Sequence, residues 1–145
     1  MRPFRLQAVL DYRKRVEDEA RKYFLLCLEE QRACAAQKEQ KEHEAQRLHM
    51  EFQEAKTNEV LLPEVMLYEE CIAAKKRELL EFEQKIRSLK LKGEQKNRVL
   101  VRASQEKRVL ELLKEKREEE AKEKQRHLEN AFLDEIAVLG HGVRK

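Results

Sequence analysis

The sequence has little of the material from which a compact globular core is built. Its 145 residues include no Trp, five Phe, three Tyr and two Pro, while charged residues make up 42% of the chain and the mean hydropathy is -0.87. So few large apolar side chains cannot offset the entropy lost when a broad core forms. A narrow seam along a helix needs only about two apolar positions in every seven. The composition therefore favours a coiled coil, and the regular apolar spacing described below argues against disorder.

Motifs that carry chemistry are also missing. With three glycines in the whole chain, no glycine-rich phosphate loop can be built. The four histidines include no pair at i and i+4, and no cysteine is near enough to complete a metal-binding set. A narrow coiled coil offers no pocket that would shift the pKa of a carboxylate or a lysine toward catalysis. We therefore predict a protein that is not an enzyme, with no catalytic residue, cofactor or metal.

The sequence shows no sign of membrane insertion or secretion. It contains no run of about 18 apolar residues, which a membrane-spanning helix requires, and its first residues lack the apolar core of a signal peptide. The three cysteines suit a reducing compartment, so we expect a cytoplasmic location. Cys27 and Cys34 lie roughly 10 Å apart along one helix, too far for a disulfide. We interpret both as small apolar seam residues.

The first half of the chain has the three-and-four spacing of a coiled coil. One apolar row contains Val9, Val16 and Tyr23, and a second row, with Lys41 as its polar member, contains Ala20, Cys27, Cys34, Leu48 and Ala55. The seam is weak over residues 37–46, which suggests a shift of the heptad frame. Asn58 and Pro63 do not favour helix. We predict a first helix over residues 4–58 and a turn over residues 59–63.

The second half of the chain has the clearer seam. Its two rows are Val65, Ile72, Leu79, Ile86, Gly93 and Leu100, and Tyr68, Lys75, Phe82, Leu89, Lys96, Ala103 and Leu110. Because Gly93 costs about 1 kcal/mol relative to Ala inside a helix, we expect a bend or soft point there. The two later glycines favour the end of the helix. We predict a second helix over residues 64–139, a tail over residues 140–145, and a single coiled-coil domain over residues 1–145.

Two long helices joined by a short break fold back on each other. With the turn at residues 59–63, the numbers of facing residues sum to roughly 124. The resulting pairs are Phe52 with Ile72, Ala45 with Leu79, Tyr23 with Leu100, and Ala20 with Ala103. Apolar residues meet apolar residues in every pair. We therefore predict an all-α fold, an elongated antiparallel two-helix coiled coil.

The same register leaves the end of the second helix without a partner. Its last ~20 residues, about 30 Å of helix, extend beyond the start of the first helix. This overhang carries the apolar cluster from Phe132 to Leu139, and exposed apolar clusters usually mark a contact site.

Charge is unevenly distributed along the predicted hairpin. Residues 37–83 hold 7 Lys/Arg and 12 Asp/Glu, a net charge of -5, whereas residues 85–117 hold 12 Lys/Arg and 4 Asp/Glu, a net charge of +8. Long helices need solvated faces, which explains such charges without a function. The alternative is electrostatic steering toward a partner of opposite charge. Nucleic acid is a further alternative for residues 85–117, but with few aromatic residues for base stacking we expect no nucleic-acid partner.

Both ends of the chain carry short motifs. Residues 4–13 read FRLQAVLDYR and are followed by Val16, Glu17 and Ala20, while residues 133–137 read LDEIA. The first motif resembles the start of the FliJ family, small components of the bacterial flagellar type III export apparatus, and the second is similar to the closing motif of that family. The resemblance in length covers the whole chain, and the specific motifs cover about a sixth of it.

The resemblance implies a fold, partners and sites. It implies an antiparallel coiled coil similar to the central shaft of rotary ATPases, whose open end inserts into the hexameric ring of the export ATPase FliI and promotes assembly of that ring. It also implies contacts with the export-gate membrane protein FlhA and with export chaperones, and hence a peripheral location at the inner membrane. Residues expected to contact the ATPase are Arg13, Lys14, Arg15, Phe132, Asp134, Glu135 and Ile136. For the gate protein we nominate Phe52, Tyr68 and Ile72, with ordinary seam packing as the alternative.

A generic coiled-coil adaptor that dimerises through its Leu-rich second helix is the alternative function. It differs from the export stalk in its oligomeric state, because a stable dimer at low micromolar concentration would disfavour the intramolecular hairpin.

Overall fold

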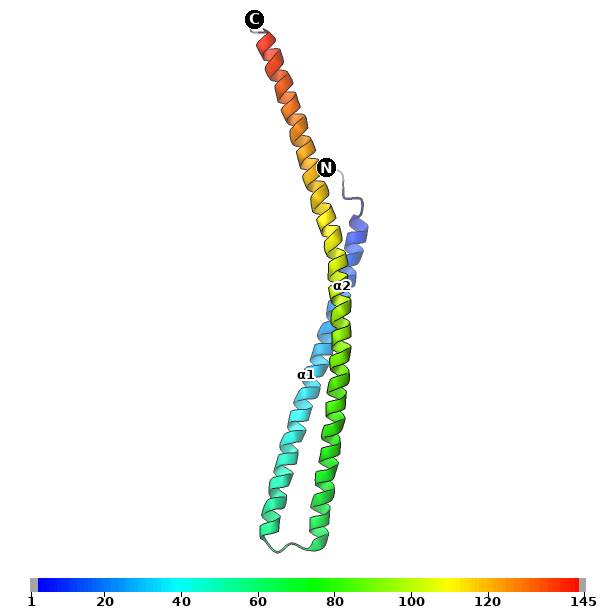
Figure 1. Cartoon of the computed structure of the whole chain (residues 1–145), viewed down its shortest axis with the longest axis vertical. Helices are drawn as coiled ribbons and strands as arrows, with labels where there is room; N and C mark the ends of the chain where they lie inside the picture. Colours follow the sequence, from blue (N-terminus) through cyan, green and yellow to red (C-terminus); the bar gives the residue numbers. More distant parts are fainter. Residues whose placement is uncertain (1–2, 144–145) are drawn as a thin grey trace. The chain divides into compact units, whose positions relative to one another are not determined.

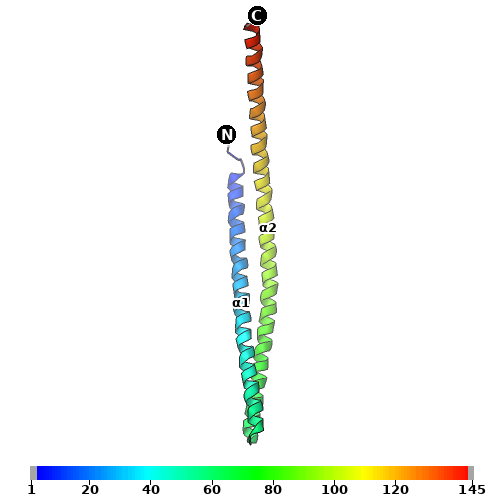
Figure 2. The same ribbon diagram turned by 90° about the vertical axis from the view of Figure 1, so that its left-hand side faces the viewer.

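Two helices make up almost all of the chain (Figure 1). The computed structural model describes residues 3–143, in which α1 spans Gln7–Thr57 and α2 spans Leu62–Val143. No strand occurs among these described residues. The helices run antiparallel and pack against each other (Figure 2), so the predicted all-α two-helix coiled coil is confirmed. Over the same residues, neither helix has an apolar stretch long enough to cross a membrane.

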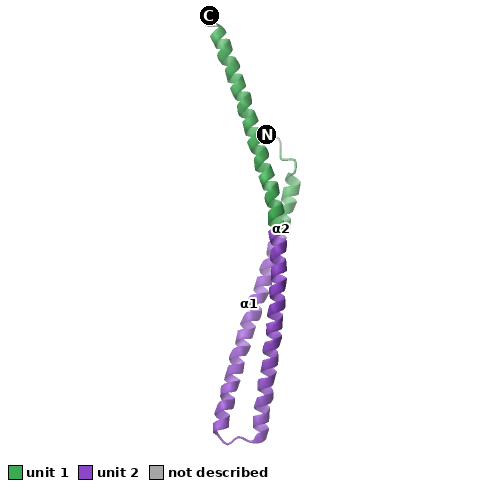
Figure 3. Cartoon of the chain, in the orientation of Figure 1, with its two compact units in different colours: residues 1–17, 102–145 green, residues 18–101 purple. Residues whose placement is uncertain are grey.

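The chain divides into two compact units (Figure 3). Unit 1 comprises residues 1–17 and 102–145, and unit 2 comprises residues 18–101. Each unit contains a segment of α1 and a segment of α2, and the turn between the helices belongs to unit 2. That the whole chain forms one domain remains a prediction.

A seam of buried and half-buried side chains follows α1 with an unbroken alternation of three and four residues. Its members are Leu10, Arg13, Glu17, Ala20, Phe24, Cys27, Gln31, Cys34, Lys38, Lys41, Ala45, Leu48, Phe52 and Ala55. The predicted row that contains Cys27 and Cys34 is confirmed, and both thiols are buried. The suggested shift of the heptad frame over residues 37–46 is wrong. Lys38 and Lys41 occupy the seam there, and each pairs with a carboxylate of α2.

The other predicted row of α1 contained Val9, Val16 and Tyr23. Val16 is half-buried, but the row is wrong by one residue at Val9 and Tyr23. Val9 and Tyr23 are 42% and 56% exposed. Leu10 and Glu17 take the seam instead, at 1% and 4% exposed, and Phe24 is half-buried. Successive helical residues point about 100° apart, so a slip of one position turns a side chain out of the seam. Both assignments keep the three-and-four spacing. The buried one uses Leu10, which is larger than Val9, and Phe24, which lacks the polar hydroxyl of Tyr23.

The seam of α2 is confirmed as predicted. Every member of its two rows, from Val65 to Leu110, is buried or half-buried, and the same spacing continues through Lys107 and Lys114. Leucine, isoleucine and phenylalanine fill seven of the thirteen predicted positions, which is why α2 could be placed from sequence.

Gly93 occupies a seam position, and α2 continues through it without a break. A bend or soft point at this residue remains a prediction. A Cβ atom at this position would lie 2.4 Å from Nε2 of Gln31. That amide donates a hydrogen bond of 2.9 Å to the carbonyl oxygen of Leu89. The missing side chain therefore makes room for a polar residue of α1 that reaches the backbone of α2.

In unit 2 the helices face each other as predicted to within one helical turn. Phe52 packs on the ring of Tyr68, with the ring centroids 5.3 Å apart, and it lines one groove together with its predicted partner Ile72. Tyr23, which was expected in the seam, lies outside it instead, with the ammonium of Lys96 5.6 Å from its ring centroid.

The turn lies slightly earlier in the chain than predicted. α1 ends at Thr57 and α2 begins at Leu62, so Pro63 is the second residue of the new helix rather than the last of the turn. Proline is tolerated there because the first amides of a helix have no intrahelical partner. The carbonyl oxygen of Leu61 accepts hydrogen bonds from the amides of Glu64 and Val65, at 3.0 and 3.2 Å.

The outer ends of the helices also differ from prediction. α1 begins at Gln7 rather than residue 4, after a turn in which its amide bonds the carbonyl oxygen of Phe4 at 3.0 Å. α2 continues past residue 139 to Val143. A glycine ends a helix by adopting a positive φ, and neither Gly140 nor Gly142 does so. Residues 144 and 145 of the predicted tail lie outside the described residues.

Candidate functional site

The basic residues predicted to face an ATPase lie near the start of α1, in unit 1. Lys14 and Arg15 are exposed. Arg13 is half-buried, and its Nη1 donates to Oε2 of Glu106 on α2 at 2.6 Å. Arg13 therefore joins the two helices, whereas Lys14 and Arg15 point into solvent, where a partner can reach them.

A buried ion pair lies one turn further along unit 1. Glu17 is 4% exposed, and its Oε1 accepts a hydrogen bond of 3.0 Å from Nζ of Lys107. This bond raises the pKa of the Lys107 ammonium above its ordinary value, because the neighbouring carboxylate stabilises the charged form. The sequence-based row had Val16 in the seam and so missed this pair. The signal was available in the spacing, since Lys107 falls on the predicted frame of α2 four residues after Ala103.

The residues before α1 lie against α2. The guanidinium of Arg117 lies over the ring of Phe4, 5.9 Å from its centroid. Beside this contact is a hollow of about 1010 Å³, whose lining includes the basic side chains of Arg5 and Lys114. Unit 1 therefore carries positive charge where α1 begins.

The C-terminal part of α2 has no intramolecular cover. Every described side chain from residue 115 to residue 142 is exposed. The large apolar ones are Leu128, Phe132, Leu133, Ile136, Val138 and Leu139, each between 48% and 72% exposed. Asp134 and Glu135, which resemble the family motif, are exposed among them. The structure thus brings the predicted residues of this helix end together on one uncovered segment.

The residues nominated for the gate protein lie in the seam near the turn. Phe52 is 6% exposed, and the ammonium of Lys56 lies 4.1 Å from its ring centroid. Tyr68 and Ile72 are half-buried. These side chains pack the two helices together, and a contact with a partner remains a prediction for them.

An ionic seam replaces apolar packing in the middle of unit 2. We use this name for Lys38, Lys41, Glu44, Lys75, Glu78 and Glu83, which form ion pairs with one another within and between the helices. The shortest pair is Lys75 Nζ with Glu44 Oε2, at 2.8 Å. The hydrogen bond from Lys75 lowers the pKa of Glu44, and the same bond raises the pKa of Lys75. These paired charges explain why residues 37–46 looked weak in the sequence.

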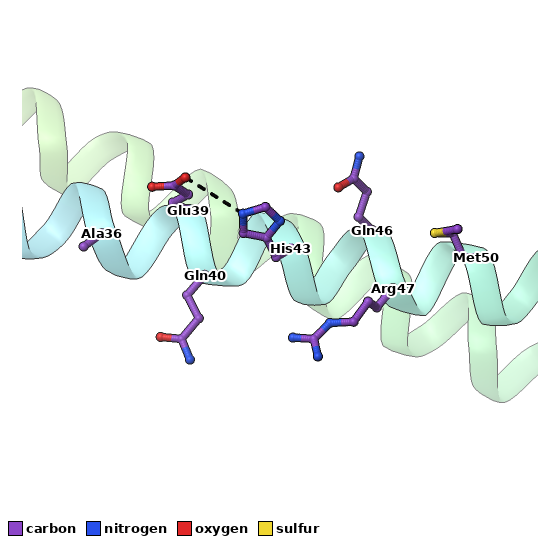
Figure 4. Close-up of a pocket in the computed structure, with 7 residues that line it drawn as sticks. All are labelled: Ala36, Glu39, Gln40, His43, Gln46, Arg47 and Met50. Atoms are coloured by element: carbon purple, nitrogen blue, oxygen red, sulfur yellow. Dashed lines mark ion pairs between the residues drawn. The ribbon is translucent and has the colours of Figure 1, made fainter.

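A surface hollow beside the ionic seam lacks the convergence of a catalytic pocket. Its volume is about 600 Å³, and its lining comes from α1 alone: Ala36, Glu39, Gln40, His43, Gln46, Arg47 and Met50. Figure 4 shows these side chains fanning away from a single helix, with one ion pair, between His43 and Glu39. Within residues 3–143, no group of three or more His, Cys, Asp or Glu side chains is placed to hold a metal ion.

An apolar patch at the start of α2 was missed by the sequence analysis. Leu61, Leu62, Met66 and Leu67 are 70%, 71%, 57% and 62% exposed. We call these four residues the turn patch. The available signal was the run VLLPEVMLY over residues 60–68, from which the seam uses only Val65 and Tyr68.

The fold and these surfaces define a class of protein. It is an antiparallel two-helix coiled coil with polar residues in its seam and an uncovered apolar helix end. The model of the family described as Flagellar FliJ protein matches residues 1–145, and the chain belongs to this family. The resemblance drawn from the terminal motifs is thereby confirmed. No curated protein matches the chain, and no solved structure does.

Family membership defines the role in broad terms. The chain is a component of the flagellar protein export apparatus and takes part in flagellum biogenesis and protein export. The family is a structural and chaperone-like part of that apparatus rather than a known enzyme.

Proposed function

We propose that the chain is a stalk that binds the ring of the flagellar export ATPase FliI and promotes its assembly. In this role it also links the ring to the export gate protein FlhA and to export chaperones. It is held at the inner membrane through these partners.

The uncovered end of α2 is the observation that carries this proposal. A helix with six large exposed apolar side chains over residues 128–139 needs a partner to remove them from water. Burying one such side chain contributes about 1.5–3 kcal/mol. Phe132 and Ile136 lie one turn apart and therefore share a face, and Asp134 and Glu135 add charge beside it. This segment is suited to insertion into a ring of subunits.

The basic start of α1 supports the same role. Lys14 and Arg15 are exposed in unit 1, and Arg13 is held by Glu106. Positive charge near an insertion site steers an oppositely charged partner and raises the association rate. We propose that Lys14 and Arg15 contact acidic groups of the ATPase. The exposed part of Arg13 belongs to the same basic surface and contacts the ATPase as well.

The gate contact is proposed at Phe52, Tyr68 and Ile72. Because Phe52 is buried, FlhA would touch mainly the half-buried Tyr68 and Ile72. Substituting Tyr68→Ala or Ile72→Ala should weaken binding of the soluble domain of FlhA. A packing role alone would instead lower the free energy of unfolding and leave that binding unchanged.

Stimulation of ATP hydrolysis tests the stalk role. Purified FliI is assayed at a concentration where the ring is incompletely assembled, with and without the chain. The chain should raise the hydrolysis rate, and Phe132→Ser with Ile136→Ser should abolish the increase. Lys14→Glu with Arg15→Glu should reduce the increase in hydrolysis rate, and the reduction should be largest at low salt. Val109→Ser is the matched control, since Val109 is 65% exposed on α2 outside the uncovered end.

Two results would contradict the stalk. If the hydrolysis rate were unchanged and no complex with FliI were detected, the stalk function would be wrong. A stable dimer of the chain alone at low micromolar concentration, seen by light scattering, would favour the generic coiled-coil adaptor instead.

A further inference from the structure

The turn patch is not used by the hairpin. Val65 faces the seam and is half-buried, whereas Leu62 and Met66 are 71% and 57% exposed, so α1 does not cover them. Leu62 and Met66 are also four residues apart and therefore neighbours on one face. Leu67 follows Met66 and points about 100° from it around the helix, and Leu61 directly precedes α2. Each of the four side chains is more than half exposed.

The surroundings of the turn patch carry one sign of charge. Residues 48–74 contain six Glu, no Asp, one Lys and no Arg, a net charge of 1 - 6 = -5. The one basic residue, Lys56, has its ammonium 4.1 Å from the ring centroid of Phe52. Glu59, Glu64 and Glu70 are exposed, and each lies within three residues of a member of the patch in the sequence. The apolar patch therefore lies in a segment where carboxylates outnumber basic side chains by six to one.

We propose that the turn patch binds a basic amphipathic helix of a partner protein. The apolar side chains provide a site for leucine-like residues spaced three and four apart, the pattern by which a helix fills a surface of this kind. The acidic border attracts Lys and Arg on the flanks of that helix. The face from Leu62 to Leu67 spans between one and two helical turns, so the contact involves a short helical segment.

Charge also distinguishes this partner from other occupants. A second copy of the chain would bring two acidic borders together, and like charges oppose that contact. An anionic membrane surface would be repelled for the same reason. The proposal is independent of the stalk, because a chain that failed to stimulate the ATPase could still bind a basic helix through the turn.

The test uses a native reporter position. Of the three cysteines only Cys71 is exposed, while Cys27 and Cys34 are buried. Cys71 lies one turn beyond Leu67 on α2, so an environment-sensitive fluorophore on its thiol reports on binding at the patch. The full-length labelled chain is titrated with a synthetic amphipathic helix of Leu and Lys. The anisotropy of a labelled version of this peptide is followed separately with unlabelled chain.

The expected result is saturable binding in both measurements that weakens as salt is raised. Leu62→Ser with Met66→Ser should lower the affinity at least about tenfold, because two apolar contacts are lost. Leu91→Ser with Val99→Ser is the matched control, since these residues are 67% and 51% exposed on α2 in the same unit. That control should leave the affinity unchanged.

Other outcomes would overturn the proposal. A Leu and Glu peptide of the same pattern that bound as tightly as the Leu and Lys peptide would be one. A scrambled Leu and Lys peptide without an apolar face that bound as tightly would be another. Tighter binding to vesicles that contain anionic lipid than to the peptide would be a third. Self-association of the labelled chain without peptide would assign the patch to a second copy. If the double Ser variant unfolds, Glu64→Lys with Glu70→Lys takes its place, and unchanged affinity for the basic peptide in that variant would also contradict the proposal.

Discussion

Polar side chains inside the seam decide which residues of α1 meet which residues of α2. Glu17 bonds Lys107, and Gln31 bonds the carbonyl oxygen of Leu89. A purely apolar seam tolerates a slip by one heptad, whereas a polar group moved to the wrong level loses its partner. These single residues therefore specify register more than they add stability.

Replacing Lys107 tests the buried pair. Lys107→Met keeps the length of the side chain and removes the 3.0 Å bond to Glu17, so the free energy of unfolding should fall by roughly 1.5–3 kcal/mol. Chemical denaturation measures the change. Lys116→Met, an exposed lysine on the same helix, should change the free energy by less than about 0.5 kcal/mol. Equal effects of the two substitutions would show that burial of the pair does not matter.

Gly93 and Gln31 should be coupled. Gly93→Ala improves helix propensity by about 1 kcal/mol but displaces the amide of Gln31 and its bond to Leu89, worth about 1 kcal/mol, so the two effects nearly cancel. In a Gln31→Ala background the same substitution should stabilise the protein by about 1 kcal/mol. A double-mutant cycle from unfolding curves checks this. Equal effects in both backgrounds would mean that Gly93 does not accommodate Gln31.

The two rows of α1 show where residue-level prediction from sequence succeeds and fails. Between Ala20 and Cys27 a seam position can fall at residue 23 or residue 24, because three-then-four and four-then-three are both heptads. Tyr23 and Phe24 are both apolar enough, so the spacing alone could not decide. The structure places Phe24 in the seam. In α2 the predicted rows keep one spacing of three and four from Val65 to Leu110, and every member of them is buried or half-buried.

The ionic seam makes unit 2 sensitive to acid. The pKa of Glu44 is lowered from its ordinary value of 4.5, first by the hydrogen bond from Lys75. A carboxylate with a lowered folded-state pKa stabilises the fold above its unfolded pKa, and this contribution is lost as pH falls through the folded-state value. Thermal unfolding between pH 7 and pH 3 should therefore show a loss of stability below about pH 4.5 that is smaller in Glu44→Gln.

The control for this acid sensitivity is Glu51→Gln, which alters an exposed carboxylate on the same helix. It should follow the wild-type profile. If the profile of Glu44→Gln coincided with that of the wild type as well, the lowered pKa would not contribute. At the alkaline end, Lys75 and Lys107 have raised pKa values, so their contributions persist until pH rises through those values.

The helix ends were only partly predictable. Asn58 and Pro63 placed the turn to within two residues, because proline constrains the backbone locally. Gly140 and Gly142 suggested a stop that the helix does not make, since glycine permits a left-handed cap without requiring one. Lys41 and Lys75 were predicted as seam members, but their ion pairs were not, because ion pairs between helices depend on register and side-chain reach that composition does not contain.

The uncovered end of α2 should contribute to binding and not to the stability of the rest of the chain. Deleting residues 126–145 removes only exposed side chains among those described, so the unfolding free energy of the remainder should change by less than about 0.5 kcal/mol. Stimulation of the export ATPase should be lost. Deleting residues 142–145 should preserve stimulation, because Phe132 and Ile136 remain. A large loss of stability in the longer deletion would show that this segment packs within the chain.

The stoichiometry of the complex with the export ATPase tests the proposed stalk most directly. Light scattering coupled to size-exclusion chromatography is carried out on a mixture of the chain and FliI with a non-hydrolysable ATP analogue. A single stalk within a hexameric ring predicts one chain for six ATPase subunits. One chain for every ATPase subunit, or no complex, would contradict the stalk.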